Sequence, residues 1–308
     1  MDKDLYKVRS LAKCTQAAYD LLSTNLKKII SRTWMPALMF AVISALTHLL
    51  VVSYPAMTDI VNGQTQDHVT GLLAITCSTL LSFFVMTWGF ARVVSLLNGQ
   101  SFKTNWPRMG RLYLLCLGLT VLLLAIIVAL GYLPILTAET PPSPNTLVLA
   151  LGIMMLGAVI TALCLIPTYY SVVKYCMEPE QKLGTVLGKA YCRGWRSWGF
   201  LFSLALLVGL ITCLLATVVL MPVMIVQTAC YANILGMSMG DPSGMPAYYP
   251  WLSFAAALLC MFVWFYIMIW EILVFYYAYG TIEAKSAIRK QVSAVTTKHD
   301  ETDFPEIS

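Results

Sequence analysis

Six apolar runs, joined by segments that alternate between basic and cation-free, constrain this chain more than any other feature. The runs cover residues 34–54, 70–90, 112–136, 146–173, 199–230 and 251–279. Each is long enough to cross the hydrocarbon core of a bilayer, which takes about 20 apolar residues in an α-helix. Composition agrees, because 59% of the 308 residues are hydrophobic and 11% are charged, against about a quarter charged in soluble domains. The sequence therefore predicts an all-α, polytopic membrane protein with six transmembrane helices.

The distribution of cations predicts how these spans are oriented. Segments 1–33, 91–111, 174–198 and 280–308 hold all twenty Lys and Arg residues, and the loops between them hold none. Positively charged loops stay on the cytoplasmic side of a membrane, so both termini are expected to be cytoplasmic. The net charge of +5 comes from groups that flank apolar runs, which does not indicate a nucleic-acid partner.

The chain divides by composition into three parts. Residues 1–33 carry apolar side chains at steps of three and four, which predicts a cytoplasmic amphipathic helix. That helix lies either on the membrane surface or against the inner ends of the spans. Residues 34–279 form the six-span domain. Residues 280–308 start as a basic helical extension and end in the polar stretch KHDETDFPEIS, which predicts disorder from about Thr296.

Similar sequences recur where the chain enters and leaves pairs of spans. The first, third and fifth spans follow SRTW, NWPRMGRL and CRGWRSWG. The second, fourth and sixth end in TWGFARVV, PTYYSVVK and FYYAYGTI. One interpretation is three tandem two-helix repeats with cytoplasmic amphipathic lead-in helices. The other is an aromatic belt at the membrane interface, where Trp and Tyr gather without any repeat.

One of these segments also carries a family resemblance. An acidic-Pro segment, an amphipathic helix, a small-residue step and R-G-W-x-x-W-G-F at 193–200 precede the long fifth span. This order resembles the six-helix bacterial inner-membrane families related to the membrane domain found beside glycerophosphodiester phosphodiesterases. The resemblance implies a six-helix architecture and a multi-pass location in the bacterial cytoplasmic (inner) membrane. It implies no catalytic residue.

Two ionisable residues inside spans are candidate intramembrane sites. Glu271, in the sixth span, is either a proton or cation site or a carboxylate tied to Arg92, to Lys174 or to Tyr or Trp donors, because an isolated carboxylate in lipid is costly. His48, in the first span, is either a ligand or a histidine hydrogen-bonded across helices, for instance to Tyr54 or Gln227. The sequence places no second histidine or inward cysteine at metal-binding spacing beside it.

The basic segments offer candidate contacts to membrane lipids. Arg108, Arg111, Arg193 and Arg196 either hold lipid phosphates or serve only to fix topology. HExxH, a phosphate-cradling glycine loop and CxxC pairs are missing, and only three histidines are present, so no metal or cofactor is predicted. We expect a non-enzymatic envelope or membrane-homeostasis component, or a membrane partner that binds a protein at its cytoplasmic face. The alternative is a small transporter or channel that uses Glu271.

Overall fold

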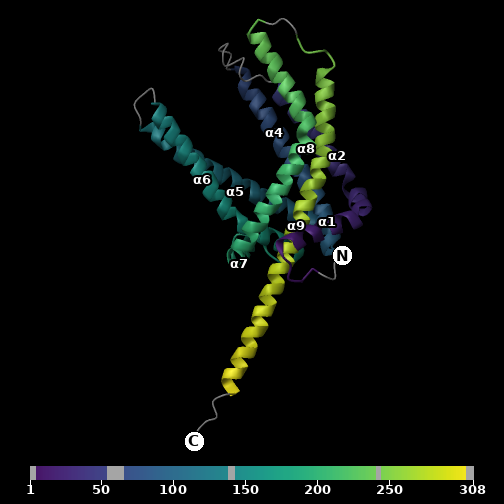
Figure 1. Cartoon of the computed structure of the whole chain (residues 1–308), viewed down its shortest axis with the longest axis vertical. Coiled ribbons are helices and arrows are strands. Elements are labelled where there is room, and N and C mark those ends of the chain that lie inside the picture. Colours follow the sequence, from purple (N-terminus) through teal and green to yellow (C-terminus); the bar gives the residue numbers. More distant parts are fainter. Residues whose placement is uncertain (1–4, 54–65, 138–142, 241–243, 303–308) are drawn as a thin grey trace. The chain divides into compact units, whose positions relative to one another are not determined.

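The computed structural model describes residues 5–53, 66–137, 143–240 and 244–302 (Figure 1). Within these ranges every regular element is helical. The elements are α1 (Leu11–Thr24), α2 (Leu26–Ser53), α4 (Gln66–Asn98), α5 (Phe102–Leu136), α6 (Pro144–Met177), the 3₁₀ turn η1 (Leu183–Thr185), α7 (Lys189–Trp195), α8 (Trp198–Ser238) and α9 (Tyr249–Thr302). The all-α fold expected from the sequence is confirmed.

Six of the helices, α2, α4, α5, α6, α8 and α9, are long and apolar enough to cross a membrane. Many of their large apolar side chains are exposed, for example Val148 at 69% and Leu214 at 71%. Apolar surface exposed on this scale is unfavourable in water, whereas lipid tails are as apolar as the side chains themselves. The six predicted spans are therefore confirmed as helices, and the chain has the make-up of a multi-pass integral membrane protein.

The N-terminal amphipathic segment is two helices rather than one. α1 ends at Thr24 and α2 begins at Leu26, so residues 26–33 form the first turns of the first long helix. Asn25 stands at the junction, and its backbone carbonyl accepts a hydrogen bond from the Ile29 N–H at 2.9 Å. Asn is favoured at this N-cap position. The boundary predicted after residue 33 thus falls inside α2.

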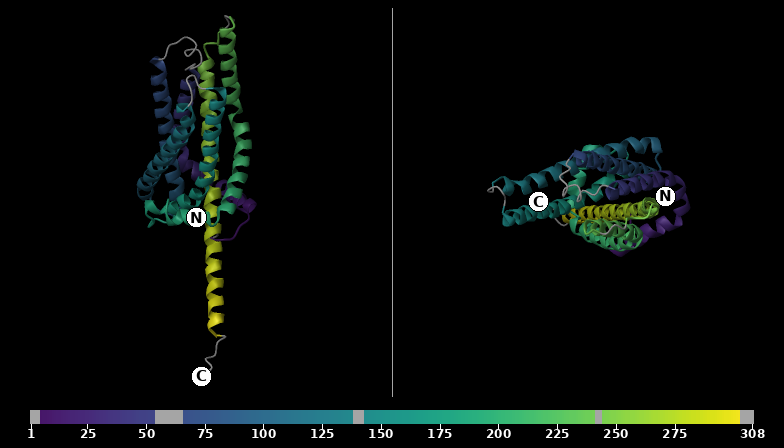
Figure 2. Two further views of the ribbon diagram at one scale, coloured as in Figure 1. Left: turned by 90° about the vertical axis from the view of Figure 1, so that its left-hand side faces the viewer. Right: turned by 90° about the horizontal axis from the view of Figure 1, so that it is seen from above.

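The C-terminal extension differs from the expectation in its length. α9 is a single helix of 54 residues, and its ribbon continues without a break in the left view of Figure 2. It lasts to Thr302, beyond the predicted start of disorder at Thr296. Residues 283–291, EAKSAIRKQ, consist mostly of strong helix formers, which favours continuation of the sixth span into a basic helix.

Two compact units share the chain. Unit 1 consists of the chain up to Leu21, of Leu114–Leu207 and of the chain from Ile272, and unit 2 consists of Leu22–Tyr113 and Val208–Glu271. α8 and α9 each contribute one part to unit 1 and another to unit 2. Polar clusters inside each unit can therefore be described on their own terms.

Consecutive spans pack against each other as hairpins. In unit 2, α2 lies along α4, and Val223 of α8 packs with Ala257 and Cys260 of α9. In unit 1, α5 lies against α6, where a Cβ on Gly131 would collide with the Met154 side chain. This pairing is compatible with the three predicted two-helix repeats, and the internal repeat stays a prediction.

Candidate functional site

A half-buried carboxylate, Glu283 of α9, is the centre of the main polar cluster in unit 1. Its Oε1 accepts a hydrogen bond from the Tyr170 hydroxyl of α6. The same oxygen accepts from Lys174 Nζ at 3.0 Å and from Arg193 Nη1 of α7 at 3.2 Å. Side-chain exposure is 19% for Glu283 and 14% for Lys174. One oxygen therefore joins α6, α7 and α9, through charge-assisted hydrogen bonds that are stronger than neutral ones.

A second carboxylate completes the cluster and balances its charge. Glu178, directly after α6, lies 3.3 Å from Lys174 Nζ and accepts a hydrogen bond from the Tyr279 hydroxyl at 2.8 Å. Burial by itself lowers the pKa of the Arg193 guanidinium. The interactions with Tyr170 and Glu283 outweigh this effect, so the pKa of Arg193 is raised overall and the side chain stays charged. Two cations thus face two anions, and the cluster stabilises the packing of the helices that supply it.

The position of α7 in this cluster depends on a proline in α6. Pro167 has no N–H, so the Leu163 carbonyl one turn earlier loses its helical hydrogen bond. The Trp198 indole N–H donates to that carbonyl at 3.2 Å. Gly194 allows the close approach, because a Cβ there would stand 2.7 Å from the Pro167 carbonyl oxygen. The R-G-W-x-x-W-G-F segment therefore combines a cation for Glu283 with a glycine and an indole that seat α7 on α6.

The N-terminal segment packs on α9 beside this cluster. A Cβ on Gly280 would collide with the Leu5 backbone carbonyl, so only glycine permits this approach. The buried Cys14 thiol of α1 lies 3.8 Å from the Thr281 hydroxyl. Burial raises the pKa of the Cys14 thiol, although Thr281 and the charge of Arg9 act in the opposite direction. The part of 1–33 that includes α1 is therefore packed against α9, and its position at the membrane surface stays a prediction.

Glu271, the intramembrane carboxylate selected from the sequence, has a different partner from those considered. Thr212 of α8 donates a hydrogen bond to Glu271 Oε1 at 2.5 Å. Lys174 is bound to the carboxylates of the unit 1 cluster. Arg92 donates to the Arg32 carbonyl at 3.3 Å. The described hydrogen-bond donor to Glu271 is therefore a threonine and none of the partners considered from the sequence, and both interpretations of Glu271 stay predictions.

Sequence reasoning does not single out Glu283, because this residue lies beyond the apolar run, in the predicted cytoplasmic extension. A signal was nevertheless present. Glu283 follows the aromatic inner end of the sixth span, FYYAYGTI, within one turn. A helix that continues through this segment carries the carboxylate along the same element as the buried tyrosines.

His48 is hydrogen-bonded across helices, as one of its two predicted roles requires. Its Nε2 lies 3.1 Å from the Ser253 hydroxyl of α9. Gln227, one of the two partners considered, instead donates to the Tyr231 hydroxyl at 3.1 Å. The other, Tyr54, lies outside the described residues.

The four arginines predicted to contact lipid phosphates occupy different environments. Arg193 is committed to Glu283 and to the Ser286 hydroxyl, at 3.4 Å. Arg111 and Arg196 are exposed, and Arg108 is half-buried. Lipid contact at these arginines stays a prediction, and it requires no rearrangement at the two exposed positions.

The chain contains one sequence pattern that is typical of catalytic serines, but the structure around it differs from that of such sites. Residues 236–240, GMSMG, match G-x-S-x-G, whose serine acts from a sharp turn between a strand and a helix. Here Ser238 is the last residue of α8, and the described part of the chain contains no strand before it. Among the described residues, no group of three His, Cys, Asp or Glu side chains is placed to hold a metal ion.

Comparison of the chain with protein-family models, curated proteins and solved structures finds no match. The resemblance of residues 193–200 to inner-membrane families therefore stays a prediction. Function has to be argued from the side chains that the fold brings together.

Proposed function

We propose that this chain is a non-enzymatic integral protein of a bacterial cytoplasmic membrane, a component of envelope or membrane homeostasis or a membrane partner for another protein. The observation that supports the proposal is the closed charge cluster of unit 1. Glu283 Oε1 accepts three hydrogen bonds, and both cations of the cluster face carboxylates. A general acid or base needs a free position within hydrogen-bond reach of its substrate. The cluster uses its charges for packing.

The distribution of cations supports the proposed orientation. All Lys and Arg residues fall in segments that alternate with cation-free loops, which favours a cytoplasmic location for both termini. On this side α7 and the basic part of α9 would present cations to anionic lipid and to a protein partner. Labelling by a membrane-impermeant maleimide tests the orientation at Cys192, which is exposed in α7. Labelling of Cys192 in intact cells, before lysis, would contradict it.

The absence of catalysis is tested with the purified full-length chain. Phospholipid and unfolded peptide are incubated with it in detergent, and products are followed by mass spectrometry. No turnover above a protein-free control is expected. Turnover that Glu271→Gln abolishes, while the variant keeps its elution volume and helical circular dichroism, would make the chain an enzyme and overturn the proposal.

A small transporter or channel is the second candidate, and Glu271 is the observation that favours it. A carboxylate inside an apolar helix is costly unless paired, protonated or hydrated, and its described partner is a single threonine hydroxyl. If the chain conducts, vesicles containing it should show proton or cation flux that Glu271→Gln removes. The conservative change Thr212→Val should then alter the flux without removing it. Equal leakage from vesicles with wild-type chain and from empty vesicles rejects this function.

A further inference from the structure

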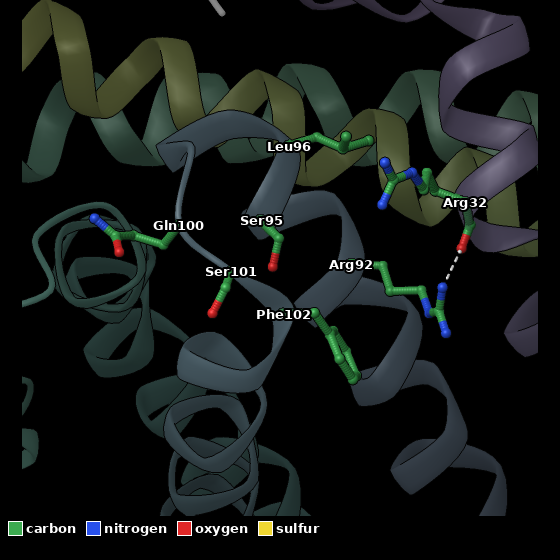
Figure 3. Close-up of a pocket in the computed structure, with 7 residues that line it drawn as sticks. All are labelled: Arg32, Arg92, Ser95, Leu96, Gln100, Ser101 and Phe102. Carbon is green, nitrogen blue, oxygen red and sulfur yellow. Dashed lines mark hydrogen bonds between the residues drawn. The ribbon is translucent and has the colours of Figure 1, made fainter.

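A cavity of about 240 Å³ in unit 2 lies where α4 ends and α5 begins (Figure 3). It is smaller than the roughly 300–1,000 Å³ of pockets that enclose a drug-sized molecule. A small group, such as a phosphate or a lipid headgroup, suits this size better. The cavity is lined by Arg32, Arg92, Ser95, Leu96, Gln100, Ser101 and Phe102.

Two guanidinium groups give the cavity its charge. Arg92 lies 5.2 Å from the ring centre of Trp88 and 5.1 Å from that of Phe102, and donates Nη1 to the Arg32 carbonyl. Its Nε is buried and has no hydrogen-bond partner among the described residues. The aromatic rings and the carbonyl thus fix the Arg92 side chain while leaving a buried donor unsatisfied, which is costly for a polar group out of water.

Neither arginine of the cavity is neutralised within the described part of the chain. The carboxylates of Glu178 and Glu283 hold cations of unit 1, and no ion pair joins a described carboxylate to Arg32 or Arg92. Arg193 of unit 1 differs from these two arginines, because it forms an ion pair with Glu283. An arginine pair without an anion, at the wall of a cavity, is the arrangement that receives phosphate through paired N–H donors.

The polar rim of the cavity is held in place by the turn between α4 and α5. Gly99 takes the positive φ of +71° that this turn requires. The buried Asn105 side chain exchanges amide hydrogen bonds of 3.1 Å with Asn98 and donates to Ser95 Oγ at 3.0 Å. Ser101 Oγ accepts from the Thr104 N–H at 3.3 Å and so caps α5. The positive end of the α5 dipole adds to the field of the arginines.

We propose that this cavity binds a phosphate group, with Arg32 and Arg92 as its ligands. Two sources share this chemistry: the headgroup of an anionic phospholipid, and free phosphate from the aqueous phase. Two apolar side chains near Arg32 on α2 are exposed, those of Met35 and Leu38. They offer an apolar surface to the acyl chains of a lipid whose headgroup is bound in the cavity. The lipid source rests on the proposed membrane function, whereas the anion site itself does not.

Binding is measured on the full-length chain with two probes. Inorganic phosphate is titrated in nonionic detergent at constant ionic strength, with thermal stability as the readout. Retention of phosphatidylglycerol against phosphatidylcholine in mixed micelles is followed by native mass spectrometry. The variants are Arg32→Gln, Arg92→Gln and Arg92→Lys. Lys28→Gln is the matched control, because Lys28 is exposed on α2 one turn before Arg32 and does not line the cavity.

Each Arg→Gln change should weaken binding about tenfold or more, since a hydrogen bond to a charged group contributes enough for this factor. Arg92→Lys should give a smaller loss, because it keeps the charge but not the planar pair of donors. Lys28→Gln should leave binding within about twofold, as expected for an exposed charge screened by salt.

Each outcome decides between the sources or against the site. Selective retention of phosphatidylglycerol without a response to phosphate supports the site and assigns it to lipid. A phosphate response alone supports the site and assigns it to a soluble anion, with no consequence for the membrane function. The proposal is overturned if neither probe binds, or if Lys28→Gln weakens binding as much as Arg32→Gln. Because the Arg32 side chain is exposed, its variant decides the question even if Arg92→Gln does not fold.

Discussion

Replacing Glu283 by glutamine removes the charge around which the polar cluster of unit 1 is arranged. The amide keeps an oxygen that can accept, so the change tests charge rather than shape. Tyr170, Lys174 and Arg193 would all lose a charged acceptor. If the cluster stabilises the packing of α6, α7 and α9, this substitution should destabilise the protein more than neutralising a nearby carboxylate outside the cluster.

The expected cost follows from the exposure of each partner. Removing one partner of a fully buried ion pair costs about 3–5 kcal/mol. Lys174 is half-buried and keeps Glu178 at 3.3 Å. Arg193 is 35% exposed, and an ion pair at an exposed position is worth about 0–1 kcal/mol. The buried Tyr170 hydroxyl keeps a weaker acceptor. We therefore expect Glu283→Gln to lower the free energy of unfolding by about 2 kcal/mol, below the fully buried limit.

The assay is unfolding of purified protein in mixed micelles with increasing sodium dodecyl sulfate, followed by circular dichroism. Glu180→Gln is the matched control, because Glu180 is exposed, lies two residues beyond Glu178 and loses the same charge. That control should change the free energy by no more than about 0.5 kcal/mol. Identical unfolding midpoints for the two variants would show that the cluster does not stabilise the fold, and would remove the main support for a structural role.

Two further predictions concern unit 1. Gly194→Ala should destabilise the protein by about 1–3 kcal/mol, because its Cβ would overlap the Pro167 carbonyl. Gly199→Ala, with open space around it, should be neutral or stabilising in the same unfolding assay. The buried Cys14 should react with maleimide far more slowly than the exposed Cys192. The raised pKa of the Cys14 thiol leaves less thiolate at neutral pH, so the labelling rate of Cys14 should keep rising above pH 8. Mass spectrometry of tryptic peptides would check both rates, and equal labelling at pH 7 would show that Cys14 is accessible.

Local sequence was enough to predict the six helices, because an apolar run of span length has few alternatives to a helix in lipid. It also identified Glu271 and His48 as polar groups that need partners. The partners themselves, Thr212 and Ser253, could not be chosen, since each lies on a helix distant in sequence and shares its residue type with many others.

By itself, then, the sequence determined the class of fold, the number of spans and the segregation of cations, all of which depend on the free energy of moving single side chains or peptide groups into lipid. The tertiary structure decided which charges meet. It joined Glu283 to Lys174 and Arg193, which are separated from it by 109 and 90 positions, and left Arg92 beside a cavity. Such pairings depend on which helix faces come together, and that is set by packing of all the helices rather than by any one segment.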